Sequence, residues 1–133
     1  MIDVSNVEKV ILDLSTNSFD PEKNFACALE YEKLNQTSSA AFFYLRAAEW
    51  GFETHPLIAY TSLLKMGICY GRQVNRENTV ASSLLHAVTF MPQRPEGQFL
   101  LARYYERNKR WQEAYTVAST GLMFAQNTYN NPL

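Results

Sequence analysis

Apolar residues recur at steps of three and four along almost the whole chain, which is the period of an amphipathic helix. No stretch alternates strictly between apolar and polar residues, as a half-buried strand would. Proline stands at the start of three of the periodic runs, where the first helical turn has no use for its missing N–H. The pattern predicts helices over about 5–14, 21–34, 37–51, 56–71, 77–90, 95–108 and 110–125, followed by a polar C-terminal tail over 126–133.

Three segments share one spacing of small and aromatic residues. In each, a small residue on a first helix precedes a tyrosine by three positions, and an alanine on the next helix follows that tyrosine. These positions are Ala28, Tyr31 and Ala40; Gly67, Tyr70 and Ala81; and Ala102, Tyr105 and Ala114. Small side chains let two helices approach to about 8–10 Å, and one hairpin cannot bury its apolar stripe alone. The spacing therefore predicts stacked helical hairpins in a single domain over residues 1–125.

The repeat resembles the tetratricopeptide repeat family. Met66-Gly67 with Tyr70, and Leu101-Ala102 with Tyr105 and Ala114, are similar to that family's core pattern. The resemblance covers about residues 21–125 and implies an all-α superhelix of three hairpins with one extra N-terminal helix. The family's usual first-helix tryptophan is absent, and its closing proline is missing at Phe52 and Gln126. Related repeats of the Sel1 type, which have longer turns, therefore stay open.

The composition excludes several classes of protein. Net charge is −1 and the isoelectric point is near 6.1, which argues against a generically basic nucleic-acid binder. Residues 1–53 carry −5 and residues 54–133 carry +4, with bases densest between Arg94 and Arg110. No apolar run approaches the length of a membrane span, and the N-terminus lacks the basic start of a signal peptide. We therefore expect a cytoplasmic protein without a membrane partner.

Residues for catalysis do not gather in any recognisable pattern. His55 and His86 are the only histidines, too few for a zinc site, and the glycines are isolated rather than set in a phosphate-binding loop. Cys27 and Cys69 are expected as buried small hydrophobic residues. The acidic residues Glu30, Glu32 and Glu49, with Lys33 and Arg46 nearby, are expected to form surface pairs. The sequence thus predicts a protein that is not an enzyme and needs no cofactor or metal.

A partner surface is expected on the first helix of each hairpin, because these helices line the concave side of such a stack. The concave-face candidates are Phe25, Leu29, Leu64, Ile68, Arg72, Phe99, Arg103 and Glu106. Their mostly apolar character favours an amphipathic or extended peptide and argues against the charged clamp that binds chaperone tails. Two alternatives stay open: the N-terminal helix fills part of this groove, or the groove is the contact face of a homo-oligomer. Phe43, Trp50 and Trp111 are candidate interface anchors.

A second resemblance concerns the third hairpin. Arg94 and Glu96, followed by Leu101-Ala102 and Tyr104-Tyr105, are similar to helical repeats found beside family 2 glycosyltransferase domains. This resemblance implies that Arg94 and Glu96 form a functional motif; the alternative is that Glu96 complements the helix dipole and pairs with Arg94. We therefore expect a non-catalytic scaffold that binds a protein or peptide. The alternative is an accessory module that supports sugar transfer by a glycosyltransferase domain, which would be its partner.

Overall fold

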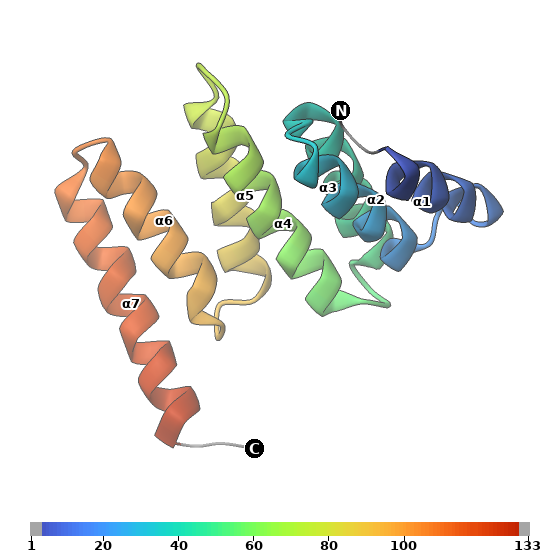
Figure 1. Cartoon of the computed structure of the whole chain (residues 1–133). Helices are drawn as coiled ribbons and strands as arrows, with labels where there is room; N and C mark the ends of the chain where they lie inside the picture. Colours follow the sequence, from blue (N-terminus) through green and yellow to red (C-terminus); the bar gives the residue numbers. More distant parts are fainter. Residues whose placement is uncertain (1–3, 131–133) are drawn as a thin grey trace. The chain divides into compact units, whose positions relative to one another are not determined.

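The computed structural model describes the backbone of residues 4–130 and the side chains of residues 4–125, and every regular element in this range is a helix (Figure 1). The helices are α1 (Ser5–Thr16), α2 (Pro21–Lys33), α3 (Thr37–Gly51), α4 (Pro56–Gly71), α5 (Glu77–Phe90), α6 (Pro95–Arg107) and α7 (Trp111–Asn130). The all-α prediction is confirmed. None of the described helices is both long and apolar enough to cross a membrane.

The predicted helix bounds differ most at the end of the chain. The sequence predicts a tail from residue 126, but α7 continues to Asn130. No proline or glycine stands between Gly121 and Asn130, so nothing in the chain stops the helix there, although its residues are polar.

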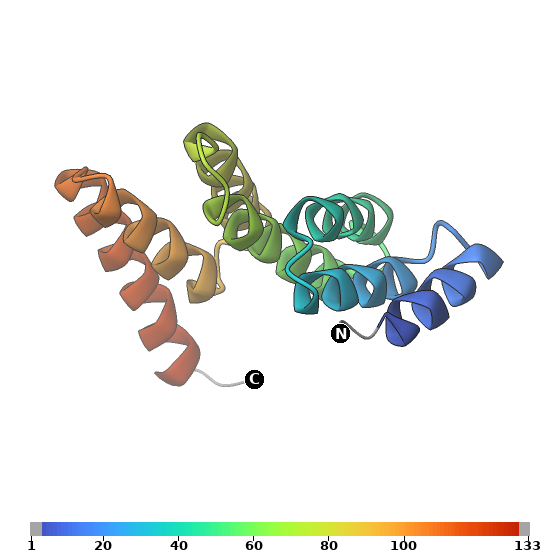
Figure 2. The same ribbon diagram turned by 45° about the horizontal axis from the view of Figure 1, so that its top comes forward.

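The chain divides into two compact units, residues 1–80 and residues 81–133. In the first unit, α2 packs against α3, α3 packs against α4, and α1 lies on α2 (Figure 2). Ala28 of α2 and Ala40 of α3 have no exposed surface, so the two backbones approach where both side chains are small. Asp20 accepts a hydrogen bond from the backbone N–H of Lys23 at 2.9 Å, which is the expected cap for α2.

Two of the turns between paired helices close in the same way. In the first, the N–H of Gln36 donates to the carbonyl of Tyr31 at 3.0 Å, and Asn35 between them is left-handed. In the third, the N–H of Arg110 donates to the carbonyl of Tyr105 at 2.9 Å, and Lys109 is left-handed. This is a Schellman ending, which satisfies the last carbonyls of the first helix. In these two hairpins the carbonyl of the repeat tyrosine thus accepts the hydrogen bond that ends the first helix.

In the second unit, α6 and α7 form a hairpin with Leu101, Ala102 and Tyr105 buried on α6 and Ala114 buried on α7. At Gly121 of α7 the two helices approach closely, because a Cβ there would lie 2.9 Å from the Cβ of Gln98.

The other repeat positions vary in burial: Gly67 is buried, whereas Tyr31, Tyr70 and Ala81 are half-buried. Tyr31 stacks on Phe43, with ring centroids 5.5 Å apart.

Replacing Gly121 by alanine tests this close approach. The new methyl group would meet Gln98 and the Phe99 ring, and we expect a loss of about 1–3 kcal/mol in the free energy of unfolding. The matched control is Gly71→Ala, where nothing lies within 4 Å of the added Cβ. That control should gain roughly 0.5–1 kcal/mol, because alanine favours helices. Urea unfolding followed by circular dichroism measures both; equal effects of the two substitutions would contradict the assigned contact.

Candidate functional site

The carboxylate of Glu32 joins three helices of the first unit. Tyr44 of α3 donates its hydroxyl to Glu32 Oε1 at 2.5 Å, and Arg72, which follows α4, donates Nη1 to Glu32 Oε2 at 3.3 Å. Lys65 of α4 places its Nζ 3.7 Å from Glu32 Oε1. The Glu32 side chain is only 14% exposed. We call these four residues the Glu32 junction; it ties α2 to both α3 and α4 through charge-assisted contacts.

The prediction of a surface pairing for Glu32 is wrong. Its neighbour Glu30 does pair with Lys33, at 3.0 Å, and the Lys33 side chain is 68% exposed. Glu32 lies two positions further, and residues two apart on a helix point in nearly opposite directions. Its carboxylate therefore points toward α3 and α4, where it accepts a hydrogen bond from Tyr44 and pairs with Lys65 and Arg72.

The environment of Tyr44 fixes which group donates in this junction. Burial raises the pKa of the Tyr44 hydroxyl far above its usual range, and the hydrogen bond to Glu32 raises that pKa further. The hydroxyl therefore keeps its proton over the whole physiological range and donates it to the carboxylate. The Arg72 side chain is 48% exposed, so its guanidinium contacts Glu32 on one side and faces solvent on the other.

The concave-face candidates of the first unit differ in how much surface they offer. Phe25 packs edge-on against Tyr44, with ring centroids 5.6 Å apart, and Leu64 is only 9% exposed. Leu29 and Ile68 are half-buried, and Arg72 is exposed. A partner molecule could therefore touch Arg72 directly and the half-buried Phe25, Leu29 and Ile68 in part, whereas Leu64 offers little surface.

In the second unit, α6 carries the remaining candidates. Phe99 is 41% exposed, and Arg103 and Glu106 are exposed. One edge of the Phe99 ring lies against the backbone at Gly121, so the side chain is held in place while much of it faces solvent. Arg103 follows Phe99 by four positions, just as Arg72 follows Ile68 by four. Each unit thus presents an apolar side chain with an arginine one turn further along the helix.

The contacts of α1 lie on one side of α2. The Cys27 thiol donates to the carbonyl of Val10 at 3.4 Å, and Lys23 Nζ donates to Thr16 at 2.7 Å. Cys27 lies two positions from both Phe25 and Leu29, which places it on the opposite side of the helix. These contacts therefore leave the Phe25 and Leu29 side of α2 to other neighbours.

Arg94 and Glu96 form an ion pair at the start of α6, with Arg94 Nη2 3.3 Å from Glu96 Oε1. Both side chains are close to half exposed. Glu96 lies in the first helical turn, where a carboxylate also complements the helix dipole. Local pairing and the helix dipole therefore account for the Arg-x-Glu spacing without a ligand.

The remaining polar candidates are dispersed. His55 Nε2 lies 3.5 Å from Glu22 and its Nδ1 lies 2.8 Å from the Thr54 hydroxyl, while His86 is exposed on α5. Over residues 4–125, no three His, Cys, Asp or Glu side chains come together in a way that could hold a metal ion. Among the candidate anchors, Trp50 packs edge-on against Phe19 and Trp111 is 62% exposed.

Comparison with solved structures shows the fold. A crystal structure of MamA matches 94% of this chain with a TM-score of 0.81 and 11% sequence identity, and the chain covers 70% of that structure. A second MamA crystal structure matches 96% of the chain with a TM-score of 0.78 and 12% identity, and 66% of it is covered. The structure of MamA MSR-1 C2 matches 92% with a TM-score of 0.70 and 14% identity, and 67% of it is covered. No protein-family model matches the chain, and no curated protein matches it in sequence.

The fold is therefore that of a tetratricopeptide-like helical repeat protein. At 11–14% identity the likeness concerns the backbone, and the chain spans about two thirds of the length of the MamA structures. The comparisons give no link to glycosyltransferases.

Glu32→Gln tests the junction. The amide keeps the size of the side chain but removes the charge that Arg72 and Lys65 approach. Its one carbonyl oxygen can still accept from Tyr44, but its NH₂ group then stands where Arg72 needs an acceptor. We expect a loss of about 1–3 kcal/mol in the free energy of unfolding, since hydrogen bonds to charged groups are worth this much. The control is Glu30→Gln, whose exposed pair with Lys33 should contribute less than about 0.5 kcal/mol. If urea unfolding gives the same small change for both variants, Glu32 does not join the helices.

The two thiols provide a second test. Cys27 and Cys69 are fully buried, and burial raises the pKa of both, that of Cys27 to about 11 from an ordinary 9.0. Because only the thiolate reacts, neither should react with Ellman's reagent at pH 8 in the folded chain, and both should react in urea. The contribution of the two thiols to stability should be constant below pH 9 and should fall from pH 9 to 11, where the unfolded thiols ionise first. Fast labelling of the folded chain would contradict this burial.

Proposed function

We propose that this protein is a non-catalytic scaffold that binds a protein or peptide through the concave-face candidates of α2, α4 and α6. The observation that carries the proposal is the Arg72 guanidinium, which Glu32 holds on one side while it faces solvent on the other. Ile68 precedes it by one helical turn and offers apolar surface. A fixed cation beside apolar side chains suits a peptide that carries both a carboxylate and apolar anchors.

The α6 surface supports the same kind of partner. Phe99 offers an aromatic anchor and Arg103 a cation at the matching spacing, with Glu106 one turn beyond. A peptide that lies across helices of this kind is bound mainly by a few apolar anchors, and the charges set its direction. The tetratricopeptide-like fold supports this proposal because stacked hairpins expose extended surfaces for partners.

The experiment is a pull-down from lysate of the source cells, with mass spectrometry of the bound protein and titration of the purified partner. The double variant Phe99→Ala, Arg103→Ala should bind that partner about tenfold or more weakly, because truncating interface anchors commonly costs more than 1 kcal/mol. The matched control is Arg107→Ala, Lys109→Ala, which removes two exposed charges at the end of α6. Circular dichroism verifies that both variants fold.

Unchanged affinity in the Phe99→Ala, Arg103→Ala variant would refute the assignment of α6. A lysate that yields no partner, together with a chain that self-associates in sedimentation, would place the scaffold function in a homo-oligomer. Recovery of a glycosyltransferase would support the accessory role in sugar transfer.

A further inference from the structure

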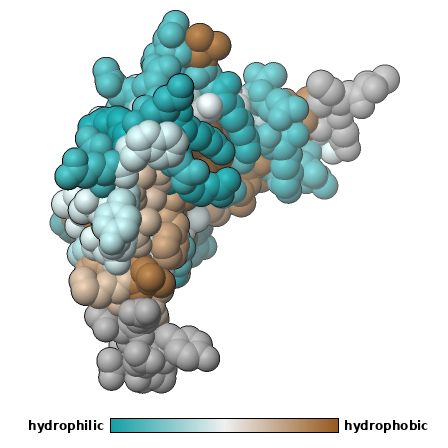
Figure 3. Space-filling view, turned by 90° about the vertical axis from the view of Figure 1, so that its left-hand side faces the viewer, coloured by the Kyte–Doolittle hydropathy of each residue, from teal (hydrophilic) through white to brown (hydrophobic). Residues whose placement is uncertain are grey.

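A row of exposed apolar side chains runs along α7. Trp111, Tyr115 and Leu122 are 62%, 75% and 54% exposed, and their spacing of four and seven places them on one face of the helix. Figure 3 shows pale to brown atoms over the lower part of this side of the molecule, below a hydrophilic upper part. Large apolar side chains gathered on a surface mark an interaction site more often than a solvated face. We call these three residues the α7 row.

The first unit shows what covers the equivalent face. When Ala40 is aligned with Ala114, as the repeat requires, Tyr115 corresponds to Ala41 and Leu122 to Ala48. Ala41 and Ala48 are only 1% and 7% exposed, on a helix that packs against both α2 and α4.

The two faces of α3 can be told apart. Gly51 of α3 lies against Pro21 of α2, so the row from Ala40 to Gly51 faces α2. The neighbouring row, with Ala41 and Ala48, is therefore the one that α4 covers. In the same way, Gly121 lies against Gln98 of α6, and the neighbouring row of α7 is the exposed one.

We propose that a helix of a partner protein packs along the α7 row, as α4 packs along α3. The row repeats an interface that already exists inside the chain, so the occupant is an amphipathic α-helix. Its chemistry differs from that of α4, because α7 presents Tyr115 and Leu122 where α3 presents alanines, and Trp111 where α3 presents Thr37. Close packing against these large side chains then requires small residues opposite. This surface is separate from the α6 candidates of the proposed function.

The charges beside the row indicate that binding depends on apolar contact. Gln112, Thr116 and Ser119 are uncharged, and Arg110 is paired with Glu113 at 3.2 Å. Such an interface should be insensitive to salt, because screening weakens only the interaction between exposed charges.

A second copy of this chain fits the row less well than a single helix. The exposed parts of the three side chains amount to roughly 400 Å². Each partner of a stable dimer contributes about 800 Å². One helix laid along three side chains matches the smaller area.

The probe is a synthetic peptide of residues 56–71, the α4 sequence, with lysines added at both ends for solubility. It carries small residues such as Ala59, Ser62 and Gly67 at positions that are buried in α4. The full chain with Trp50→Phe keeps Trp111 as its only tryptophan, so fluorescence emission reports on the row itself. We expect a saturable blue shift that is the same at low and high salt.

The variant Tyr115→Glu, Leu122→Glu should bind the peptide about tenfold or more weakly, because it puts charges into an apolar contact. The control Gln112→Glu, Thr116→Glu adds the same charges on the polar side of α7 and should bind normally. Absence of a saturable shift, or equal binding by the row variant, would overturn the proposal. So would a dimer of the unmodified chain that the row variant dissolves, since the occupant would then be a second copy. None of these outcomes depends on the α6 surface, so the proposed function is tested separately.

Discussion

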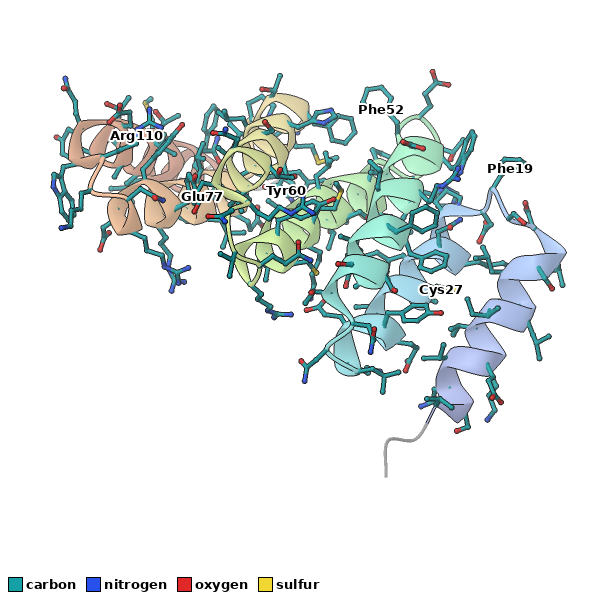
Figure 4. The ribbon with its side chains drawn as sticks, turned by 90° about the horizontal axis from the view of Figure 1, so that it is seen from above. Phe19, Cys27, Phe52, Tyr60, Glu77 and Arg110 are labelled. Atoms are coloured by element: carbon teal, nitrogen blue, oxygen red, sulfur yellow. The ribbon has the colours of Figure 1, made fainter. Side chains whose placement is uncertain are left out.

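Close approach of neighbouring helices is the constraint on which the rest of the fold depends. Ala28 and Ala40, on the paired helices α2 and α3, have no exposed surface, and Gly121 leaves no room for even one methyl group beside Gln98. Helices brought this near to each other bury long apolar stripes with modest side chains. The larger residues, Tyr44 and Leu101 among them, then fill the spaces on either side, and the polar groups that remain inside must find partners at fixed places. The Glu32 junction, in the first unit, is such a place. Figure 4 shows the ribbon with its side chains.

The fold was largely predictable from the sequence, because helical period, starting prolines and the repeat of small and aromatic residues agree with one another. Asp20 before Pro21 marks the start of α2 correctly, and the seven helices appear where the period places them. The end of α7 was missed because a run of polar residues without proline or glycine is compatible with a helix as well as with a tail. The left-handed residues at Asn35 and Asn75 carried a usable signal, since asparagine tolerates that conformation. Lys109 carried none.

The site was predictable only in part, because single-helix reasoning does not say which helix faces which. Glu32 has Lys33 next to it in sequence, but its actual partners lie 12, 33 and 40 positions further along the chain. Lys65 and Arg72 are seven apart and share one face of α4, so a search for a buried acid opposite them could have found the junction. The burial of Leu64, which is only 9% exposed, could not be inferred from its own helix alone. Arg94 and Glu96, in contrast, interact within one turn, and their pairing was foreseen.

The turns have a consequence for how regular the repeat is along this chain. In the first and third hairpins, the first helix ends with a hydrogen bond to the repeat tyrosine from the residue five positions later. The second hairpin carries a longer connection, in which Asn75 is left-handed and Val74 is 85% exposed. Gln73 in this connection donates its Nε2 to the hydroxyls of Thr37 and Ser38, at 3.3 and 3.0 Å, whereas Val74 and Asn75 are exposed and can accommodate extra residues. Each such change alters the repeat period, here 39 and then 35 residues between the small residues of successive first helices. Two chains can thus have almost the same backbone although the regular period of the repeat is lost from one of the sequences.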